Sequence, residues 1–233
     1  GSYYGKSGYG YIKGNKLRAV PDLEKYHGTD TFLTEALTIE ANAQIDQAIA
    51  EKAPFFLYMS HYAVHGPFET DNRFSAHYES SDKPADAKSF ATLIEGMDKS
   101  LGDMMDHLDS LGIAENTLIL FLGDNGSDAP LGPSREYSSS APLRGKKGTE
   151  FEGGMRVPCI VAWAKPDESN KWQKQFTVAE GAVQTQMGTV MDILPTLATF
   201  AGAEIPDSYP VDGQDLRTLL TGKADRTRED CFL

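Results

Sequence analysis

Residues 117–127 read TLILFLGDNGS, a run of apolar side chains that stops abruptly at a group of turn-forming residues. A short, continuous apolar run of this kind is typical of a strand that is buried on both faces. Similar runs occur at 54–60 (PFFLYMS) and at 157–163 (VPCIVAW). The sequence therefore predicts three buried strands.

Amphipathic helices are predicted between and after these strands. Apolar residues recur at helical spacing over 34–52 and over 89–111. A further helix is expected over 189–200, with a capping box at its start and a kink at Pro195. Helices alternating with apolar strands predict an α/β fold with a mostly parallel sheet flanked by helices.

The composition excludes several classes of protein. The 233 residues include 22 Lys and Arg against 34 Asp and Glu, a net charge of −12, with 40% hydrophobic residues and two cysteines. Disordered, collagen-like and disulfide-stapled chains are excluded by these values. The acidic balance argues against nucleic acid as a partner, and no stretch approaches the ~18 apolar residues of a membrane span. No signal-peptide core begins the chain, so the compartment stays open.

Polar residues follow two of the predicted strands, at the strand ends where ligands collect in α/β sheets. Asp124 and Asn125 offer a carboxylate and an amide oxygen, which suit Ca²⁺ or Mg²⁺, although an ordinary Asp-Asn-Gly turn has the same sequence. His61 and His65 follow 54–60. Two histidines at this spacing can bind zinc when both lie on one face of a helix, but the Gly-Pro that follows His65 disfavours a helix here. His65 is therefore interpreted as a candidate for proton transfer.

A small group of cationic side chains stands out in this acidic chain. Residues 130–147 contain Arg135, Arg144, Lys146 and Lys147 against a single glutamate. Neighbouring glycines let backbone and ammonium groups approach an anion closely. An anion site and a solvated basic turn are both compatible with this pattern.

Five segments then invite comparison as a set: Pro54–Glu69 (PFFLYMSHYAVHGPFE), Thr117–Ser127 (TLILFLGDNGS), Pro142–Pro158 (PLRGKKGTEFEGGMRVP), Asp192–Gly202 (DILPTLATFAG) and Asp212–Gly222 (DGQDLRTLLTG). In order and spacing they resemble successive segments of the type I sulfatases, from about Thr31 to Leu233. The resemblance implies an alkaline-phosphatase-like α/β fold. It also implies hydrolysis of sulfate esters with a formylglycine nucleophile and Ca²⁺ or another divalent cation.

The resemblance assigns roles to individual residues. It implies that Asp124-Asn125 are two of the metal ligands and that His65 lies near the leaving group. It implies that Lys147 contacts the sulfate, within a loop that also offers Arg144 for substrate binding. Lys146 replaces the small residue usual before that lysine, so the assignment between the two lysines stays open.

The resemblance also implies what this chain lacks. The family's N-terminal aspartate ligands, its C/S-x-P-x-R nucleophile motif and its smaller C-terminal subdomain have no counterpart here. Residues 1–233 are therefore interpreted as part of a single catalytic domain of a longer enzyme. The chain alone is expected to be inactive, and the formylglycine is expected in the parent enzyme only.

The parent's substrate is expected to be a small-molecule or carbohydrate sulfate ester, and a periplasmic or secreted location is typical of the family. Two other functions stay open: a phosphonate or phosphodiester hydrolase of the same fold, and a non-catalytic anion-binding homologue. The nucleophile upstream of Gly1 would distinguish them.

Overall fold

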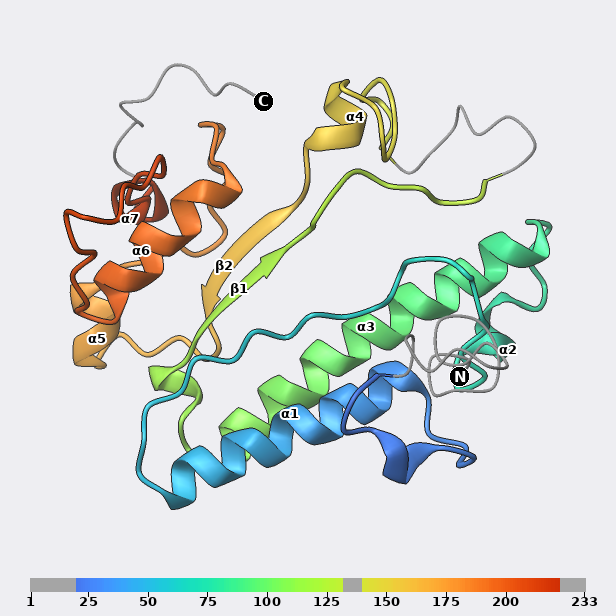
Figure 1. Ribbon diagram of the computed structural model, residues 1–233, viewed down its shortest axis with the longest axis horizontal. Coiled ribbons are helices and arrows are strands. Elements are labelled where there is room, and N and C mark those ends of the chain that lie inside the picture. The colour runs from blue at the N-terminus through green and yellow to red at the C-terminus, as the bar shows by residue number, and fades with distance from the viewer. Residues whose placement is uncertain (1–19, 132–139, 223–233) are drawn as a thin grey trace. The chain divides into compact units, whose positions relative to one another are not determined.

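The computed structural model describes residues 20–131 and 140–222 (Figure 1). These residues form two compact units, the first within Gly1–His107 and Gly123–Val157, the second within Leu108–Leu122 and Pro158–Leu233. Arg135, one of the expected cationic residues, lies outside the described residues.

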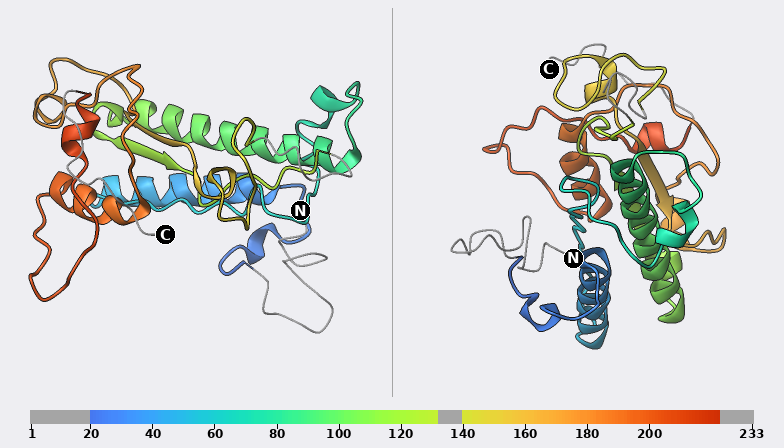
Figure 2. Two further views of the ribbon diagram at one scale, coloured as in Figure 1. Left: turned by 90° about the horizontal axis from the view of Figure 1, so that it is seen from above. Right: turned by 90° about the vertical axis from the view of Figure 1, so that its right-hand side faces the viewer.

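Two long helices dominate the first unit. Helix α1 spans Leu33–Ala50 and α3 spans Ala85–Ser110, and they lie side by side in the views of Figures 1 and 2. Both confirm helices that periodicity predicts, and α3 begins four residues before its expected start. Gly112 ends α3 with φ +67°, a left-handed conformation that glycine adopts without strain. The shorter helices of this unit are η3 (Glu24–Tyr26), α2 (Ser75–Tyr78) and α4 (Glu152–Met155).

Small and apolar residues hold α1 in place. Leu33 and Ala36, on the first turns of α1, form a buried cluster with Val20, Leu23 and Tyr26. Further along, the Thr38 and Ser100 hydroxyls are 2.6 Å apart in the buried contact between α1 and α3. Among the described residues, every helix is too short or too polar to cross a membrane.

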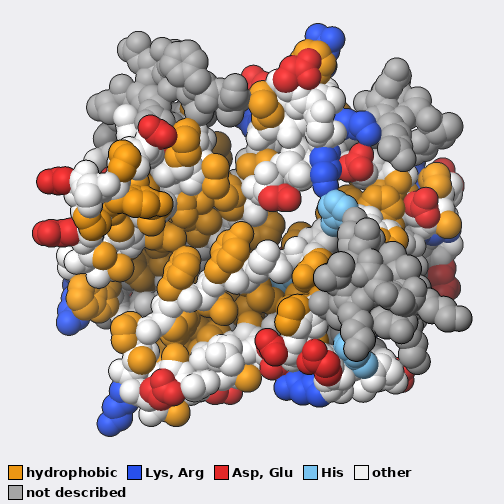
Figure 3. Space-filling view, viewed as in Figure 1, with side chains coloured by type: hydrophobic (Ala, Val, Ile, Leu, Met, Phe, Trp, Pro, Cys, Tyr) orange, Lys and Arg blue, Asp and Glu red, His pale blue; other side chains and the backbone are white. Residues whose placement is uncertain are grey.

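The second unit contains a two-stranded ribbon. Strand β1 (Leu118–Leu122) pairs antiparallel with β2 (Cys159–Trp163), with Leu120 opposite Val161. Two of the three predicted strands are thus confirmed, but full burial was a wrong expectation, because Ile160 is 60% exposed. Hydrophobic side chains are open to solvent over β2 and α6 in Figure 3. This ladder is the only one in the described part of the chain, and it is not parallel.

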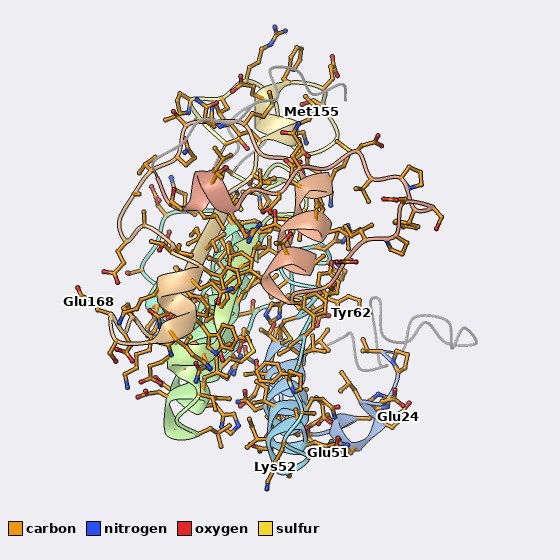
Figure 4. All side chains as sticks on the ribbon, turned by 90° about the vertical axis from the view of Figure 1, so that its left-hand side faces the viewer. Glu24, Glu51, Lys52, Tyr62, Met155 and Glu168 are labelled. Carbon is orange, nitrogen blue, oxygen red and sulfur yellow. The ribbon has the colours of Figure 1, made fainter. Side chains whose placement is uncertain are left out.

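The third predicted strand, 54–60, is not a strand in the structure. It is part of an extended segment, and no described residue pairs with it. Phe56 and Tyr58 are 76% and 81% exposed, and Tyr62 beyond them is labelled in Figure 4. An apolar run indicates that a segment favours burial, but a ladder also needs a neighbouring strand to supply the hydrogen-bond partners.

A buried carboxylate organises the rest of the second unit. Asp192, at the junction of η5 (Val190–Asp192) and α6 (Ile193–Phe200), accepts hydrogen bonds from the Thr189 and Gln214 N–H groups, both at 2.8 Å. Asp192 is 0% exposed. Two of the matched segments, 192–202 and 212–222, are therefore joined through one side chain. The remaining elements are η4 (Ala114–Asn116), α5 (Lys171–Gln175) and α7 (Arg217–Leu220).

Pro195 does not interrupt a helix, contrary to expectation. The regular helix α6 begins at Ile193, so Pro195 occupies its first turn. An N–H at that position has no intrahelical acceptor, and its absence costs no hydrogen bond.

Candidate functional site

The turn that follows β1 carries Asp124 and Asn125. The Asp124 side chain is exposed and Asn125 is partly buried. The Asn125 amide donates to Asp124 Oδ1 at 3.0 Å and to the Gly126 carbonyl at 3.3 Å. The two side chains therefore lie next to each other on the turn.

Backbone hydrogen bonds connect this turn to the glycine-rich segment 144–154. The Gly126 N–H donates to the Gly154 carbonyl at 2.8 Å, and the Lys147 N–H donates to the Ser127 carbonyl at 3.0 Å. A methyl group on Gly126 would collide with the backbone at Gly153 and Gly154. The structure thus brings the segment of Asp124 and Asn125 into direct contact with that of Lys147.

The two adjacent lysines have different surroundings. The Lys146 ammonium forms an ion pair with Asp128 at 3.0 Å. The Lys147 ammonium has no hydrogen bond or ion pair to any other described residue, and its side chain is partly buried. Lys147 is therefore the lysine whose charge is available to an anion.

Arg144 begins the same loop. Its guanidinium lies over the Phe151 ring, 3.8 Å from the ring centroid, and its carbonyl accepts the Gly153 N–H at 2.7 Å. Stacking on an aromatic face leaves the guanidinium edge open to hydrogen bonding. Arg144 thus stands at the surface with its orientation set by Phe151. The loop leads into α4, whose last residue, Met155, is labelled in Figure 4.

The two histidines of the 54–69 segment differ in burial. His65 is exposed, and its Nδ1 lies 2.8 Å from the Gly66 carbonyl, an acceptor that requires Nδ1 to carry the proton. The His65 N–H donates to the Tyr62 carbonyl at 2.9 Å, within the same loop, and the place of His65 beside Lys147 stays a prediction. His61 Nδ1 is buried without a hydrogen-bond partner among the described residues, and burial lowers the pKa of this imidazole.

The described residues do not complete a metal site. Ca²⁺ takes about six to eight oxygen ligands, and Asp124 and Asn125 supply two side chains with suitable oxygens. No cluster of three or more His, Cys, Asp or Glu side chains that could hold a metal ion occurs among the residues described. The donor chemistry fits part of a Ca²⁺ site and not the whole of it.

Sequence reasoning missed Asp128 as a member of this site. Its partner Lys146 lies 18 positions later, and no pattern of spacing connects an acidic residue to a lysine across a loop of that length. Thr149, whose hydroxyl accepts the Lys146 N–H at 3.1 Å, was also missed, although it lies only three residues after Lys146.

Comparison with known proteins places the chain in a family. The family model described as Sulfatase matches residues 2–203. The chain belongs to the sulfatase family. It is 34% identical over 180 residues to the steryl-sulfatase of Mus musculus, covering 76% of this chain and 26% of that relative. It is 33% identical over 192 residues to the N-acetylgalactosamine-6-sulfatase of the same species, covering 82% of this chain and 33% of the relative.

A solved structure supports the same conclusion. The PsFucS1 sulfatase from Pseudoalteromonas sp. is similar to this chain with a TM-score of 0.64 and 29% identity, covering 84% of this chain and 36% of that one. The resemblance seen in the sequence is thus confirmed at the level of the family and of its α/β fold. The chain spans about a third of the length of the sulfatases it matches.

Proposed function

We propose that the longer protein containing this chain hydrolyses sulfate esters, and that this chain supplies part of the active site. The observation that carries the proposal is the hydrogen bond from the Lys147 N–H to the Ser127 carbonyl. This hydrogen bond holds Lys147, whose ammonium is available, next to the turn that contains Asp124 and Asn125.

The proposed roles follow from the chemistry of each side chain. Lys147 stabilises negative charge on the sulfuryl oxygens in the transition state, and Arg144 binds the substrate anion. His65, with one ring nitrogen held by the Gly66 carbonyl, assists the departing alkoxide by protonating it. Asp124 and Asn125 are two of the ligands of a divalent cation, Ca²⁺ by preference, since both offer hard oxygen atoms.

Other parts of the longer protein complete this site. The remaining metal ligands and the formylglycine nucleophile belong to segments outside residues 1–233. We further propose that both compact units belong to one catalytic domain with a mostly parallel sheet, in which 54–60 pairs with a strand from elsewhere in the protein. The exposed Phe56 and Tyr58 support this, because they are apolar side chains without cover.

The substrate class is proposed from the relatives' names. One relative is named for a steryl sulfate and another for a sulfated N-acetylgalactosamine. A small-molecule or carbohydrate sulfate ester is therefore the proposed substrate. Membership of the sulfatase family does not favour a phosphonate or phosphodiester hydrolase.

The proposal is tested on the full-length protein with an aryl sulfate, by measuring sulfate release. Lys147→Ala is expected to lower kcat by roughly 10²-fold, the usual scale for losing an electrostatic stabiliser. Lys165→Ala is the matched control, because that ammonium pairs with Asp109 and Glu115 in the second unit. A wild-type protein that cleaves phosphodiesters but no sulfate ester, or that only binds anions, would refute the proposal.

The role of His65 is tested with a series of leaving groups. His65→Ala is expected to lower kcat by about 10²-fold for a substrate with a basic leaving group. The loss should shrink for an acidic phenol, which departs without protonation. A loss of equal size across the series would exclude His65 as the proton donor.

A further inference from the structure

The lysine pair at 146–147 is held in a narrowly defined loop. Gly145 and Gly148 flank it with φ values of +89° and +80°, which favour glycine over residues with a side chain. The Thr149 hydroxyl accepts from the Lys146 N–H at 3.1 Å and donates to the Lys146 carbonyl at 2.8 Å. The backbone at Lys146 is therefore fixed by Thr149, and its side chain is fixed by a separate contact.

That separate contact is the ion pair with Asp128. The Lys146 ammonium and Asp128 Oδ1 are 3.0 Å apart, and their side chains are 27% and 43% exposed. Asp128 lies next to Ser127, whose carbonyl accepts the Lys147 N–H. The same short segment thus fixes the side chain of one lysine and the backbone of the next.

We propose that the Asp128–Lys146 ion pair determines the anion specificity of the site by withdrawing one of two adjacent ammonium groups. This inference rests on the proposed function. With Lys146 neutralised by Asp128, the lysine pair presents a single uncompensated positive charge, that of Lys147. A sulfate monoester carries one negative charge, whereas a phosphate monoester carries close to two near neutral pH. Pairing of Lys146 with Asp128 removes one positive charge from the site and so favours the monoanion, whereas release of the Lys146 ammonium would favour the dianion.

Lys146 acts here as a positioning residue and does not contact the substrate. Its ammonium is turned to Asp128, which holds the loop so that Lys147 alone faces the anion. A direct contact between Lys146 and the substrate would require this ion pair to break.

The test uses the full-length protein, with benzenesulfonate as a monoanionic probe and phenylphosphonate, mostly a dianion at pH ~8, as a dianionic probe, and affinities are measured by calorimetry at that pH. Asp128→Asn releases the Lys146 ammonium and is expected to raise the ratio of dianion to monoanion affinity (phenylphosphonate to benzenesulfonate) about fivefold, the scale of a partly exposed charge interaction. Lys146→Met leaves the Asp128 carboxylate unpaired, so it is expected to lower that ratio by a similar factor.

The double variant decides between positioning and direct contact. Asp128→Asn combined with Lys146→Met removes both charges, and the affinity ratio is expected to return to that of the wild type. Asp109→Asn is the matched control, because Asp109 pairs with Lys165 at 2.6 Å in the second unit, and it should leave the ratio unchanged. The proposal is overturned if Asp128→Asn leaves the affinity ratio unchanged, or if the double variant lowers that ratio as much as Lys146→Met does.

A second measurement does not depend on turnover or on anion affinity. Acetic anhydride labelling, read by mass spectrometry, should modify Lys147 faster than Lys146, and Asp128→Asn should remove this difference. Equal labelling of the two lysines in the wild type would overturn the inference. If the ratio and labelling behave as expected but no sulfate ester is cleaved, the proposed function fails and the role of the ion pair stands.

Discussion

Lys146 and Lys147 show how far neighbouring residues of one type can differ in their surroundings. Their order in the sequence leaves open which of them serves the site. The structure separates them, because Asp128 pairs with Lys146 and leaves the Lys147 ammonium without a partner among the described residues. A side chain's chemistry can be read from its type, but its availability depends on its partners.

His61 is predicted to make the protein's stability sensitive to mild acid. Burial lowers its pKa in the folded state, whereas the unfolded chain binds a proton near the ordinary value of about 6.5. Between these two values the unfolded state holds more protons, so the free energy of unfolding falls as the pH drops below about 6.5. Above that pH, His61 makes no contribution to the pH dependence.

The corresponding variant is His61→Phe, which removes both the titrating group and the buried, unpaired Nδ1. Urea unfolding at two pH values is expected to show that the loss of stability between pH ~7.5 and ~5.5 shrinks by up to about 1 kcal/mol. The exposed His27→Gln is the control and should leave the loss unchanged. An unchanged pH dependence in His61→Phe would contradict the prediction.

At the scale of elements, helices were easier to predict than strands. The helix α3 follows from apolar spacing along its own length, and its end follows from Gly112. The segment 54–60 has a strand-like composition but no ladder, because its hydrogen-bond partners would have to come from another segment. Helices satisfy their backbone locally, and strands do not.

Close backbone packing between the β1 turn and the segment 144–154 predicts a cost for any side chain at Gly126. Gly126→Ala is expected to destabilise the protein by about 2–3 kcal/mol, because its methyl group would meet the Gly153 and Gly154 backbone. Gly102→Ala is the control on α3: that position has open space around it, so the change should stabilise the protein by up to about 1 kcal/mol. Thermal unfolding measures both, and equal effects would contradict the packing argument.

Asp192 is predicted to be essential for joining η5 and α6 to the segment after them. Asp192→Ala removes the acceptor of the partly buried N–H groups of Thr189 and Gln214, at an expected cost of about 2–3 kcal/mol. Asp82→Ala serves as control, because that side chain is 93% exposed, and it should change the free energy of unfolding by less than about 0.5 kcal/mol. Urea unfolding measures both variants. A loss at Asp192 as small as at Asp82 would show that neither hydrogen bond contributes.

At the scale of the whole molecule, the chain spans only part of the length of its sulfatase relatives. It covers 26% and 33% of the two mouse sulfatases described above. Apolar side chains such as Phe56, Ile160 and Val190 remain 60% to 76% exposed. Such exposure is typical of surfaces that contact other parts of a protein.

Residues 1–233 alone are predicted to have no sulfatase activity and only weak affinity for Ca²⁺. Two neighbouring side chains, Asp124 and Asn125, supply too few of the about six to eight oxygen ligands that Ca²⁺ takes. The purified chain is assayed with an activated aryl sulfate and titrated with Ca²⁺ by calorimetry. Multiple turnovers, or a Ca²⁺ site with a sub-micromolar Kd, would refute the interpretation of Asp124 and Asn125 as part of a larger site.

The sequence by itself indicates much of the chemistry of this protein. The helices α1 and α3 follow from apolar spacing, and the candidate residues Asp124 and Asn125 follow from their residue types after a predicted strand. The sulfatase family follows from five segments taken in order and spacing, and the same resemblance narrows the anion contact to Lys146 or Lys147. Within each helix and each segment, the information lies in residues that are close together in the chain.

Only the tertiary structure shows which distant groups meet. Three features depend on residues that are far apart in the chain. They are the antiparallel register of β1 and β2, the ion pair between Asp128 and Lys146, and the burial of Asp192. Such contacts form when packing brings separate segments together, and no local pattern encodes that partner choice. The physical reason is that hydrogen bonds and ion pairs are short-range in space and indifferent to distance along the chain.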